Sequence, residues 1–335
     1  MKQGAEEFPK SLLQATRYFQ DPDVCVDFVA SMRWPYGVTC PHCAGDKVSY
    51  LSSRRIWKCM AKDCHKQFSV KTQSVFEDSP IPLDKWLVAV WLVVNCKNGI
   101  SSYEIARDLK VTQKSAWFML HRIRLALKNC NWSKFGGSEG GPVEVDETYI
   151  GPKPQKMHKS RRAKIQARDG LNGGYVGKTA VFGALDRDLR KIRATVLPNV
   201  ARKTLQQEIF QAIESGSTVY SDQASVYDRL LLAGYMHLTV NHTKEYVNGQ
   251  VHTQGIDNFW SLLKRGLTGT YVAVEPFHLD RYVDEQVFRY NNRATKDNPL
   301  DDADRFALAV SQIAGKRLTY AELTGKTEPP SSAEF

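Results

Sequence analysis

Long hydrophobic runs are missing from this 335-residue chain. The longest apolar stretch, WLVAVWLVV at 86–94, has about half the length needed to cross a bilayer. The first ten residues, MKQGAEEFPK, contain no apolar segment of the kind found in secretory signals. The chain also has no internal repeat and no long low-complexity tract. We therefore expect a cytoplasmic protein with no membrane partner, not a repeat array.

Cysteine is scarce and unevenly placed. The chain has seven cysteines, an odd number that does not suit a secreted framework in which every cysteine is paired. Three stand alone, and we interpret them as small buried hydrophobic residues: Cys25, Cys96 and Cys130. The other four form two short pairs, 40-CPHC-43 and 59-CMAKDC-64, separated by fifteen residues. This spacing predicts a tetrahedral zinc site made by Cys40, Cys43, Cys59 and Cys64.

The predicted zinc site has an energetic reason. A segment of about 40 residues rarely folds on its own core, whereas one structural zinc contributes roughly 10–16 kcal/mol. His42 or His65 could replace one of the cysteines, so the ligand set stays open. In each case four protein ligands leave no position for water, and we expect one structural Zn²⁺ in a ribbon over residues 36–72.

Negative charge is in short supply. The formal net charge is +10, and the pI is near 9.2, which predicts a polyanionic partner such as nucleic acid. Residues 153–168 hold seven Lys/Arg and no acid. We expect this stretch to be a loop that follows the DNA backbone, through Lys159, Arg161, Arg162 and Lys164 among others. The alternative is a solvated loop without a binding role.

Residues 100–127 have the pattern of two helices joined by a tight turn. Ser101 or Ser102 can cap the first helix, and Thr112 can cap the second. The arrangement resembles a helix-turn-helix, whose second helix enters the major groove. The residues expected to face DNA are Lys114, His121, Arg122 and Arg124. A plain helical hairpin with a solvated basic face is the alternative, and the adjacent zinc ribbon and basic charge favour DNA binding.

The pattern along the chain predicts a multi-domain protein. We expect a helical N-terminal segment (1–35), the zinc ribbon (36–72), the helix-turn-helix region (80–132), a glycine-rich linker (133–142), an α/β domain (143–300), and a C-terminal helix with a frayed tail (301–335). Five short strand-like runs begin at residues 143, 179, 191, 218 and 237, with a helix-like segment at 201–216. This order predicts a mixed sheet with helices.

Three acids lie where strands end or helices begin. Asp146 sits in the apolar strand VEVDETYIG, where an unpaired acid is costly. Asp222 ends the strand TVYSD, and Asp257 opens an amphipathic helix. Three converging carboxylates repel each other, and divalent cations remove that cost. Two such cations can activate a water or a 3′-hydroxyl against a phosphodiester.

Five blocks of sequence resemble bacterial insertion-sequence transposases of the DDE type, in particular the ISXO-like family with an N-terminal zinc ribbon. They are CPHC with the second cysteine pair, VEVDETYIG, YSDQASVY, VHTQGIDNFWSLLKRGLTGTY and RYVDEQVFRYNNR, within residues 36–300. The resemblance implies a ribonuclease-H-like catalytic domain and DNA strand transfer with Mg²⁺ or Mn²⁺, two per active site. It also implies a homo-oligomer that joins transposon ends to target DNA, at the bacterial nucleoid.

The resemblance assigns the first catalytic acid to Asp146 and the second to Asp222. The third falls in GIDNFWSLLK, where such enzymes commonly have Glu, with a basic residue seven positions later. This chain has Asp257 there, Lys264 seven residues on, and Arg265 beside it. Asn258 is the alternative, because some members of the family have Asn at this point, and we favour Asp257.

On this helix we expect Asp257 to point at the metal and Lys264 at DNA, on the face opposite Trp260. We expect Glu144 and Glu147 to point away from Asp146, in packing or supporting roles. Three further roles stay open. His252 could touch the scissile phosphate or make a hydrogen bond at the helix start. Arg289 and Arg293 could contact DNA or only solvate a helix end.

The function predicted from these residues is a DDE transposase that cleaves the ends of an insertion sequence and transfers them into target DNA. Two alternatives remain. One is a domesticated or inactive transposase that acts as a DNA-binding regulator, which the Asp in place of Glu keeps open. The other is a ribonuclease-H-like nuclease without joining activity.

Overall fold

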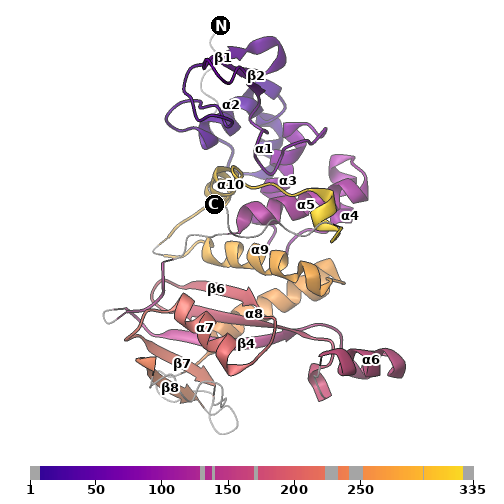
Figure 1. Cartoon of the computed structure of the whole chain (residues 1–335), viewed down its shortest axis with the longest axis vertical. Coiled ribbons are helices and arrows are strands. Elements are labelled where there is room, and N and C mark those ends of the chain that lie inside the picture. The colour runs from indigo at the N-terminus through magenta and orange to yellow at the C-terminus, as the bar shows by residue number, and fades with distance from the viewer. Residues whose placement is uncertain are drawn as a thin grey trace. The chain divides into compact units, whose positions relative to one another are not determined.

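The computed structural model describes residues 8–128, 133–137, 140–169, 173–222, 233–240, 252–296 and 298–326. The chain forms two compact units, whose elements are labelled in Figure 1. The N-terminal unit comprises Met1–Lys128 together with Asn292–Phe335, and the central unit comprises Asn129–Asn291. The boundaries differ from the predicted ones, because the central unit ends at Asn291 instead of residue 300. The C-terminal segment belongs to the N-terminal unit.

The N-terminal unit begins with two short helices, as predicted, α1 (Leu12–Tyr18) and α2 (Pro22–Arg33). They pack with α3 (Leu83–Asn95) and with α10 (Asp302–Ser311) from the other end of the chain. Phe306 of α10 is fully buried. Its ring stacks on Phe28 at 5.4 Å between centroids and lies 5.1 Å from Trp91. The C-terminal helix therefore completes the core of this unit.

A small antiparallel sheet follows α2, in the order β1 (Val48–Leu51), β2 (Ile56–Cys59) and β3 (Gln67–Phe68), with a 3₁₀ turn η1 (Ser52–Arg54) between the first two strands. Trp57 lies between Tyr50 and Phe68, with ring centroids 4.8 and 6.1 Å away. Arg55 pairs with Asp23 at 2.5 Å, which joins the first turn of the sheet to the start of α2. The sheet thus has one packed aromatic face.

The two helices predicted at 100–127 are α4 (Ser102–Leu109) and α5 (Gln113–Leu127). Ser101 accepts from Glu104 N and forms a capping box with the Glu104 side chain, and Thr112 accepts from Ser115 N. Both predicted caps are confirmed, with Ser101 instead of Ser102 for the first helix. A last short helix, α11 (Tyr320–Leu323), packs against α5.

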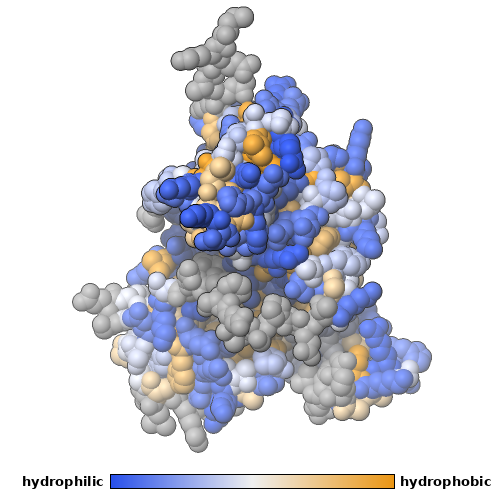
Figure 2. All heavy atoms as spheres, turned by 45° about the horizontal axis from the view of Figure 1, so that its top comes forward, coloured by the Kyte–Doolittle hydropathy of each residue, from blue (hydrophilic) through white to orange (hydrophobic). Residues whose placement is uncertain are grey.

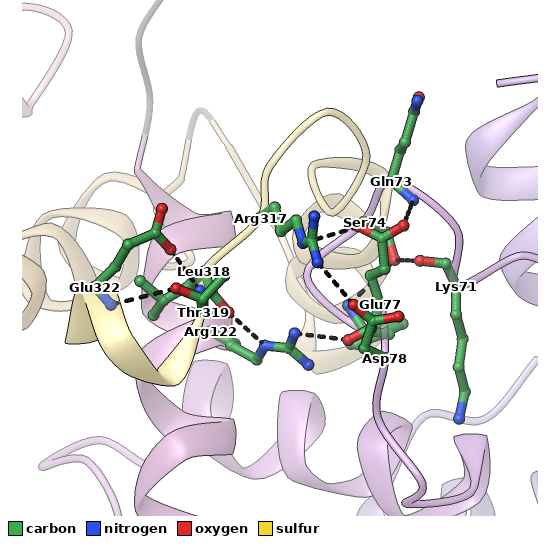
Figure 3. A network of polar contacts seen from close by, with 11 residues as sticks. Lys71, Gln73, Ser74, Glu77, Asp78, Arg122, Arg317, Leu318, Thr319 and Glu322 are labelled. Carbon is green, nitrogen blue, oxygen red and sulfur yellow. Dashed lines mark hydrogen bonds and ion pairs between the residues drawn. The ribbon is translucent and has the colours of Figure 1, made fainter. Parts of the chain in front are cut away.

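Three of the four residues predicted to face DNA on α5 lie in the interior instead. His121, Arg122 and Arg124 are 0%, 4% and 1% exposed. Arg122 donates from Nε to Leu318 O at 3.1 Å and from Nη2 to Glu77 O at 2.6 Å (Figure 3). The prediction was wrong for these residues because helix periodicity alone does not show which faces of a helix the rest of the unit covers, as the C-terminal segment covers Arg122.

Lys114 stays exposed in the first turn of α5, where its ammonium group lies 4.5 Å from the ring of Tyr320. At the other end of the helix, Lys316 Nζ donates to Ala126 O and Lys128 O, both at 2.7 Å. These donations satisfy carbonyl groups that the end of a helix leaves without internal partners. Within α5 only Gln113 and Lys114 are exposed, and both lie in its first turn.

The central unit contains one five-stranded sheet. Its strands are β4 (Val143–Ile150), β5 (Thr179–Asp186), β6 (Lys191–Val196), β7 (Thr218–Asp222) and β8 (Met236–Val240). Their spatial order is β6-β5-β4-β7-β8. β5 runs antiparallel to β4 and β6, whereas β7 runs parallel to β4 and β8. The predicted mixed sheet and its five strands are confirmed.

Helices cover both faces of this sheet (Figure 1). One face packs on α7 (Arg202–Ala212), and the other packs on α8 (Gln254–Gly266) and α9 (Leu279–Asn291). Alternate residues along each strand separate the two layers, with Val143 and Val145 toward α7, and Val181 and Leu185 toward α8 and α9. After α8 the chain passes through a π-helical turn, η6 (Leu267–Tyr271), and a 3₁₀ turn, η7 (Pro276–His278).

The basic stretch 153–168 is helical, not the loop that was predicted. A 3₁₀ turn η2 (Pro154–Lys156) leads into α6 (Lys159–Asp169), and η3 (Gly173–Tyr175) follows after the undescribed residues 170–172. Lysine, arginine, alanine and glutamine all favour helices, which explains the difference. Most of the described side chains of this segment remain exposed, because it has no apolar stripe to bury.

The predicted linker at 133–142 is also more ordered than a linker. In its described part, Phe135 is 3% exposed and forms an isolated bridge with Ile213. Gly137 N donates to Ser217 Oγ at 2.7 Å. A Cβ at Gly136 would lie 2.4 Å from the same Ser217 Oγ. The glycines here permit a close approach to the sheet.

The face of the molecule seen in Figure 2 is mainly hydrophilic, with hydrophobic side chains scattered over it. Across the described residues, no helix combines the length and the apolar character that a membrane span requires.

Arg122 offers a test of the N-terminal unit. Arg122→Met would leave Leu318 O and Glu77 O without their donor, and we expect the free energy of unfolding to fall by about 1–3 kcal/mol. Urea denaturation followed by circular dichroism measures this change. Arg107→Met on α4 is the matched control, because that side chain is 75% exposed, and its effect should stay within about 0.5 kcal/mol. Equal effects would contradict an interior role for Arg122.

Candidate functional site

The four clustered cysteines form a site suited to one metal ion. Their sulfur atoms all lie within 4.8 Å of one another. Cys40 Sγ is 3.8 Å from Cys64 Sγ, and Cys43 Sγ is 3.6 Å from Cys59 Sγ. A tetrahedron with zinc–sulfur bonds of about 2.3 Å has edges of about 3.8 Å, so the spacing fits zinc. The geometry of the described cluster therefore suits one zinc ion held by four thiolates.

His42 and His65 were the open alternatives for this site. Both are exposed, and the described cluster contains neither of them. The four cysteines come from the loop before β1, from the end of β2 and from the turn before β3. A metal bound there would hold the ends of the small sheet together, which is a structural task.

A second set of polar residues lies where β4 and β7 run side by side. Glu144 of β4 is paired in register with Tyr220 of β7. Asp146 and Asp222 each follow two residues later, so they lie level on adjacent parallel strands and face the same side. That side is the one covered by α8.

Asp146 bears the strongest electrostatic perturbation in this region. Burial, together with the negative charges of Glu147, Asp257 and Asp222, raises the pKa of Asp146 to about 7. Trp260 Nε1 donates to Asp146 Oδ2 at 2.9 Å, and this bond opposes the increase. Asp222 and Asp257, from a second strand and a helix, therefore both act on Asp146.

Seven residues make nearly two helical turns, so Asp257 and Lys264 share one stripe of α8. Asn258 and Arg265 share the neighbouring stripe, and all four side chains are exposed. Asp257 and Trp260 are three residues apart and therefore neighbours on the helix surface. The prediction that Asp257 lies on the face opposite Trp260 was wrong. Trp260 is 4% exposed and belongs to the core, yet its indole N–H reaches Asp146.

Glu144 does not point away from Asp146 as predicted. Side chains two residues apart on a strand share a face, and Glu144 is 1% exposed beneath the start of α8. Its Oε1 accepts from Arg187 Nε at 2.6 Å, and its Oε2 accepts from Ile256 N at 2.8 Å. Strand alternation, applied to VEVDETYIG, would have indicated this position.

Arg187 links Glu144 to the segment before α8. Its Nη2 donates to His252 O at 2.5 Å and to His252 Nδ1 at 2.7 Å. Because a guanidinium group only donates, Nδ1 accepts, and the ring proton of His252 lies on Nε2. The guanidinium also lies 4.6 Å from the ring centroid of Tyr220. His252 thus has a positioned ring at the helix start, and its contact with a phosphate stays a prediction.

Gly183 makes room for the bond between Trp260 and Asp146. It is paired with Asp146 across β4 and β5. A Cβ at Gly183 would lie 2.8 Å from two ring atoms of Trp260. Neither Gly183 nor Arg187 was singled out in the sequence, because each matters only through residues that are distant along the chain.

The remaining basic residues separate into exposed and interior ones. Those of α6 lie on one helix, which stands away from the strands in Figure 1, with Arg162 partly covered and Lys159, Arg161 and Lys164 exposed. Arg289 is interior, at 9% exposure, and pairs with Glu285 and with Gln286 Oε1. Glu285 also accepts from the Tyr271 hydroxyl. The prediction that Arg289 could contact DNA is therefore wrong. Through Glu285, Arg289 instead connects α9 to the turn after α8.

The chain thus combines a cluster of four cysteines suited to zinc with a mixed sheet that carries a group of acids. These two features define a protein with a zinc ribbon and an acidic site. Comparison with known protein families identifies the family. Residues 139–291 match the ISXO2-like transposase domain, and residues 20–67 match the transposase zinc-ribbon domain. The chain belongs to this family of insertion-sequence transposases.

Two relatives agree with this family. A protein of Halobacterium salinarum described as "Uncharacterized protein in transposable element ISH50" is 27% identical over 247 residues, which cover 72% of this chain and 82% of the relative. An "Uncharacterized transposase-like protein" of Haemophilus influenzae is 31% identical over 106 residues, which cover 32% of this chain and 85% of the relative.

Among solved structures, a chain from a simian T-cell lymphotropic virus intasome in complex with PP2A regulatory subunit B56 gamma is similar over 55% of this chain and 63% of its own length. The TM-score is 0.27 and the identity 10%. A likeness of this size carries no argument about fold or function.

The cysteine cluster predicts a measurable zinc content. We expect about one zinc ion per purified full-length chain, measured by plasma mass spectrometry. Cys59→Ser removes a buried ligand and should lower that content by at least about half, because thiolates hold zinc far better than hydroxyls. Cys96→Ser, outside the cluster, should retain the zinc. Full zinc content in Cys59→Ser would show that the cluster binds no metal.

The raised pKa of Asp146 predicts a pH-dependent stability. The folded protein binds this proton more tightly than the unfolded chain does, so stability falls as pH rises from about 4 toward about 7. Without added divalent cations, Asp146→Asn should raise the melting temperature at pH 8 by about 5 °C. It should have little effect at pH 4.

The exposed Glu275→Gln is the control for this measurement. Scanning calorimetry at both pH values separates the cases. A melting temperature of Asp146→Asn that equals the wild-type value at pH 8 would mean that the ionised Asp146 carries no folding cost.

Proposed function

We propose that the chain is an active DDE transposase that cleaves DNA at the ends of its insertion sequence and transfers those ends into target DNA. The observation that carries this is that the charges of Asp222 and Asp257 act on the buried Asp146, in a chain of a transposase family. The acids come from the first strand, the fourth strand and the following helix of the central unit. Asp257, not Asn258, is the third acid, because its negative charge acts on Asp146.

The central unit has a ribonuclease-H-like fold in this proposal. The support is its strand order, in which three antiparallel strands, β6-β5-β4, continue into β7 and β8 parallel to β4. Helices pack on both faces, and the two aspartates on strands lie on adjacent parallel strands in the middle of the sheet. The side covered by α8 is then the catalytic side.

The donor set fits hard divalent cations. Carboxylate oxygens are the ligands that Mg²⁺ and Mn²⁺ prefer, and Asp146, Asp222 and Asp257 would hold two such ions. When bound, the ions activate the attacking oxygen and stabilise the leaving oxygen of an in-line displacement. Trp260 donates a hydrogen bond to Asp146 Oδ2, and this bond would hold the orientation of a carboxylate that binds a metal.

The reaction has two steps in the proposal. The oxygen of a water attacks a phosphorus at the transposon end, the P–O3′ bond breaks, and a 3′-hydroxyl is freed. That hydroxyl then attacks a phosphorus of the target and displaces its 3′-oxygen. Lys264, on the stripe of Asp257, binds a DNA phosphate, and the Nε2–H of His252 is available as a second donor.

DNA is the partner in this proposal. The exposed basic side chains of α6 follow its backbone, and Lys114 in the first turn of α5 lies where a recognition helix contacts bases. Arg265 adds a positive charge beside Lys264. Because two ends must be joined, the active complex is a homo-oligomer on DNA.

Strand transfer tests the proposal directly. Purified full-length protein is mixed with a pre-cleaved end oligonucleotide from the DNA flanking the gene, a supercoiled plasmid, and Mg²⁺ or Mn²⁺. Joined product should form, and Asp146→Ala, Asp222→Asn and Asp257→Asn should each lower its rate by at least about 10²-fold, as the loss of a charge-stabilising group does elsewhere. Binding of the end, measured by gel shift, should persist in all three variants.

Asn258→Ala is the control for Asp257→Asn, and it should retain most of the activity. Tight end binding without product under either metal would favour the non-catalytic DNA-binding regulator. Cleavage without joining would favour the nuclease. Full activity in Asp222→Asn would remove the acidic site from the mechanism.

A further inference from the structure

The start of α8 is capped from another element. Thr253, its N-cap residue, donates from Oγ1 to Asp257 Oδ2 at 3.4 Å and makes no described side-chain capping bond to the helix backbone. Instead the N–H of Ile256, in the first turn, donates to Oε2 of the buried Glu144 on β4, at 2.8 Å. A carboxylate at this position satisfies a donor that the helix itself leaves open and complements the helix dipole.

The contact between Ile256 and Glu144 leaves room only for glycine at the preceding position, Gly255. A Cβ at Gly255 would lie 2.9 and 3.2 Å from the two oxygens of Glu144, and 3.2 Å from Leu185 Cδ2. The helix start thus approaches the strand as closely as its backbone permits. A side chain there would move either the helix or the Glu144 carboxylate.

A second bond joins the same two elements one turn further on. Trp260 Nε1 donates to Asp146 Oδ2 at 2.9 Å. Glu144 and Asp146 are two residues apart, or about 6.7 Å along a strand. Ile256 and Trp260 are four residues apart, or about 6 Å along a helix. The near match lets both bonds form at once, as two rungs between β4 and α8.

Arg187 holds the side chain of Glu144 in place and also contacts β7, the strand that carries Asp222. It donates to Glu144 Oε1 at 2.6 Å and to the carbonyl of His252, just before the helix. Its guanidinium also lies over Tyr220, which precedes Asp222 by two residues on β7. Arg187 therefore compensates the negative charge of Glu144 and also contacts the segment before α8 and strand β7.

We infer that Glu144 is a positioning residue that sets where Asp257 stands relative to Asp146. Asp257 directly follows Ile256, so it lies between the two rungs, and its carboxylate moves with the helix start. Loss of the first rung leaves Asp146 in place but shifts one ligand of the metal pair. This inference rests on the proposed metal-dependent function and assigns a task to residues outside the three acids.

Gly255→Ala is the sharpest test, because it changes no charge and removes no hydrogen-bonding group. Alanine has a higher helix propensity than glycine. Without the close contact, the substitution would therefore leave the stability of the protein unchanged or raise it. With it, Mg²⁺ affinity measured by calorimetry on the full-length protein should weaken about 10-fold, with end-DNA binding unchanged. Gly269→Ala is the matched control, since a Cβ there meets nothing within 4 Å, and it should keep the wild-type Mg²⁺ affinity.

Glu144→Gln and Glu144→Ala give a second measurement. Glutamine retains an oxygen that can accept from Ile256 N, so Glu144→Gln should keep more of the Mg²⁺ affinity than Glu144→Ala. The Mg²⁺ concentration for half-maximal strand transfer should rise in the same order. A role limited to stability would lower the melting temperature of these variants and leave the Mg²⁺ requirement unchanged.

Two outcomes overturn the inference. One is a Gly255→Ala protein with wild-type Mg²⁺ affinity, whatever its melting temperature. The other is an equal loss in Gly255→Ala and Gly269→Ala. Failure of the proposed function is distinguishable, because wild-type protein would then bind no Mg²⁺ that Asp146→Ala removes. If the Glu144 variants do not fold, Gly255→Ala alone decides.

Discussion

Repulsion between carboxylates is the interaction that the rest of the central unit must withstand. Asp146 and Asp222 lie level on adjacent strands, and Asp257 and Glu147 add their charges nearby, so burial and repulsion together raise the pKa of Asp146. Such a site needs a rigid frame, because like charges separate wherever the backbone allows it. Three features supply the frame: strands in the middle of the sheet, a helix bonded to the strand at two points, and an ion pair between the buried Glu144 and the partly buried Arg187.

Much of this fold follows from local patterns in the sequence. The five strands of the central unit, the caps of α4 and α5, and the spacing of the four cysteines all depend on residues near one another in the chain, and each has the predicted structure. Asp222 lies at the end of β7 and Asp257 in the first turn of α8, as their patterns indicate, whereas Asp146 lies inside β4 and not at its end. Their catalytic roles remain proposals.

The wrong prediction for Arg122 and the unpredicted contact of Trp260 share one physical reason. Arg122 looks exposed on an isolated helix, and it is buried because a segment about 200 residues away covers it. Trp260 looks like an ordinary core residue, yet its indole nitrogen reaches a strand 114 residues earlier. The basic helix α6 was missed for a different reason, since it has no apolar stripe and only helix propensity marks it. Long-range packing decides what a periodic pattern leaves open.

The route of the chain through the N-terminal unit has a consequence for biosynthesis. The core of the N-terminal unit combines the first 128 residues with Phe306, and Lys316 caps the last turn of α5. A ribosome that has made only the first 128 residues has therefore made an N-terminal unit with an unfinished core. That unit is completed only after the whole central unit has been synthesised. A translation product that ends early would lack a finished N-terminal unit, so premature termination should not release a stable fragment of it.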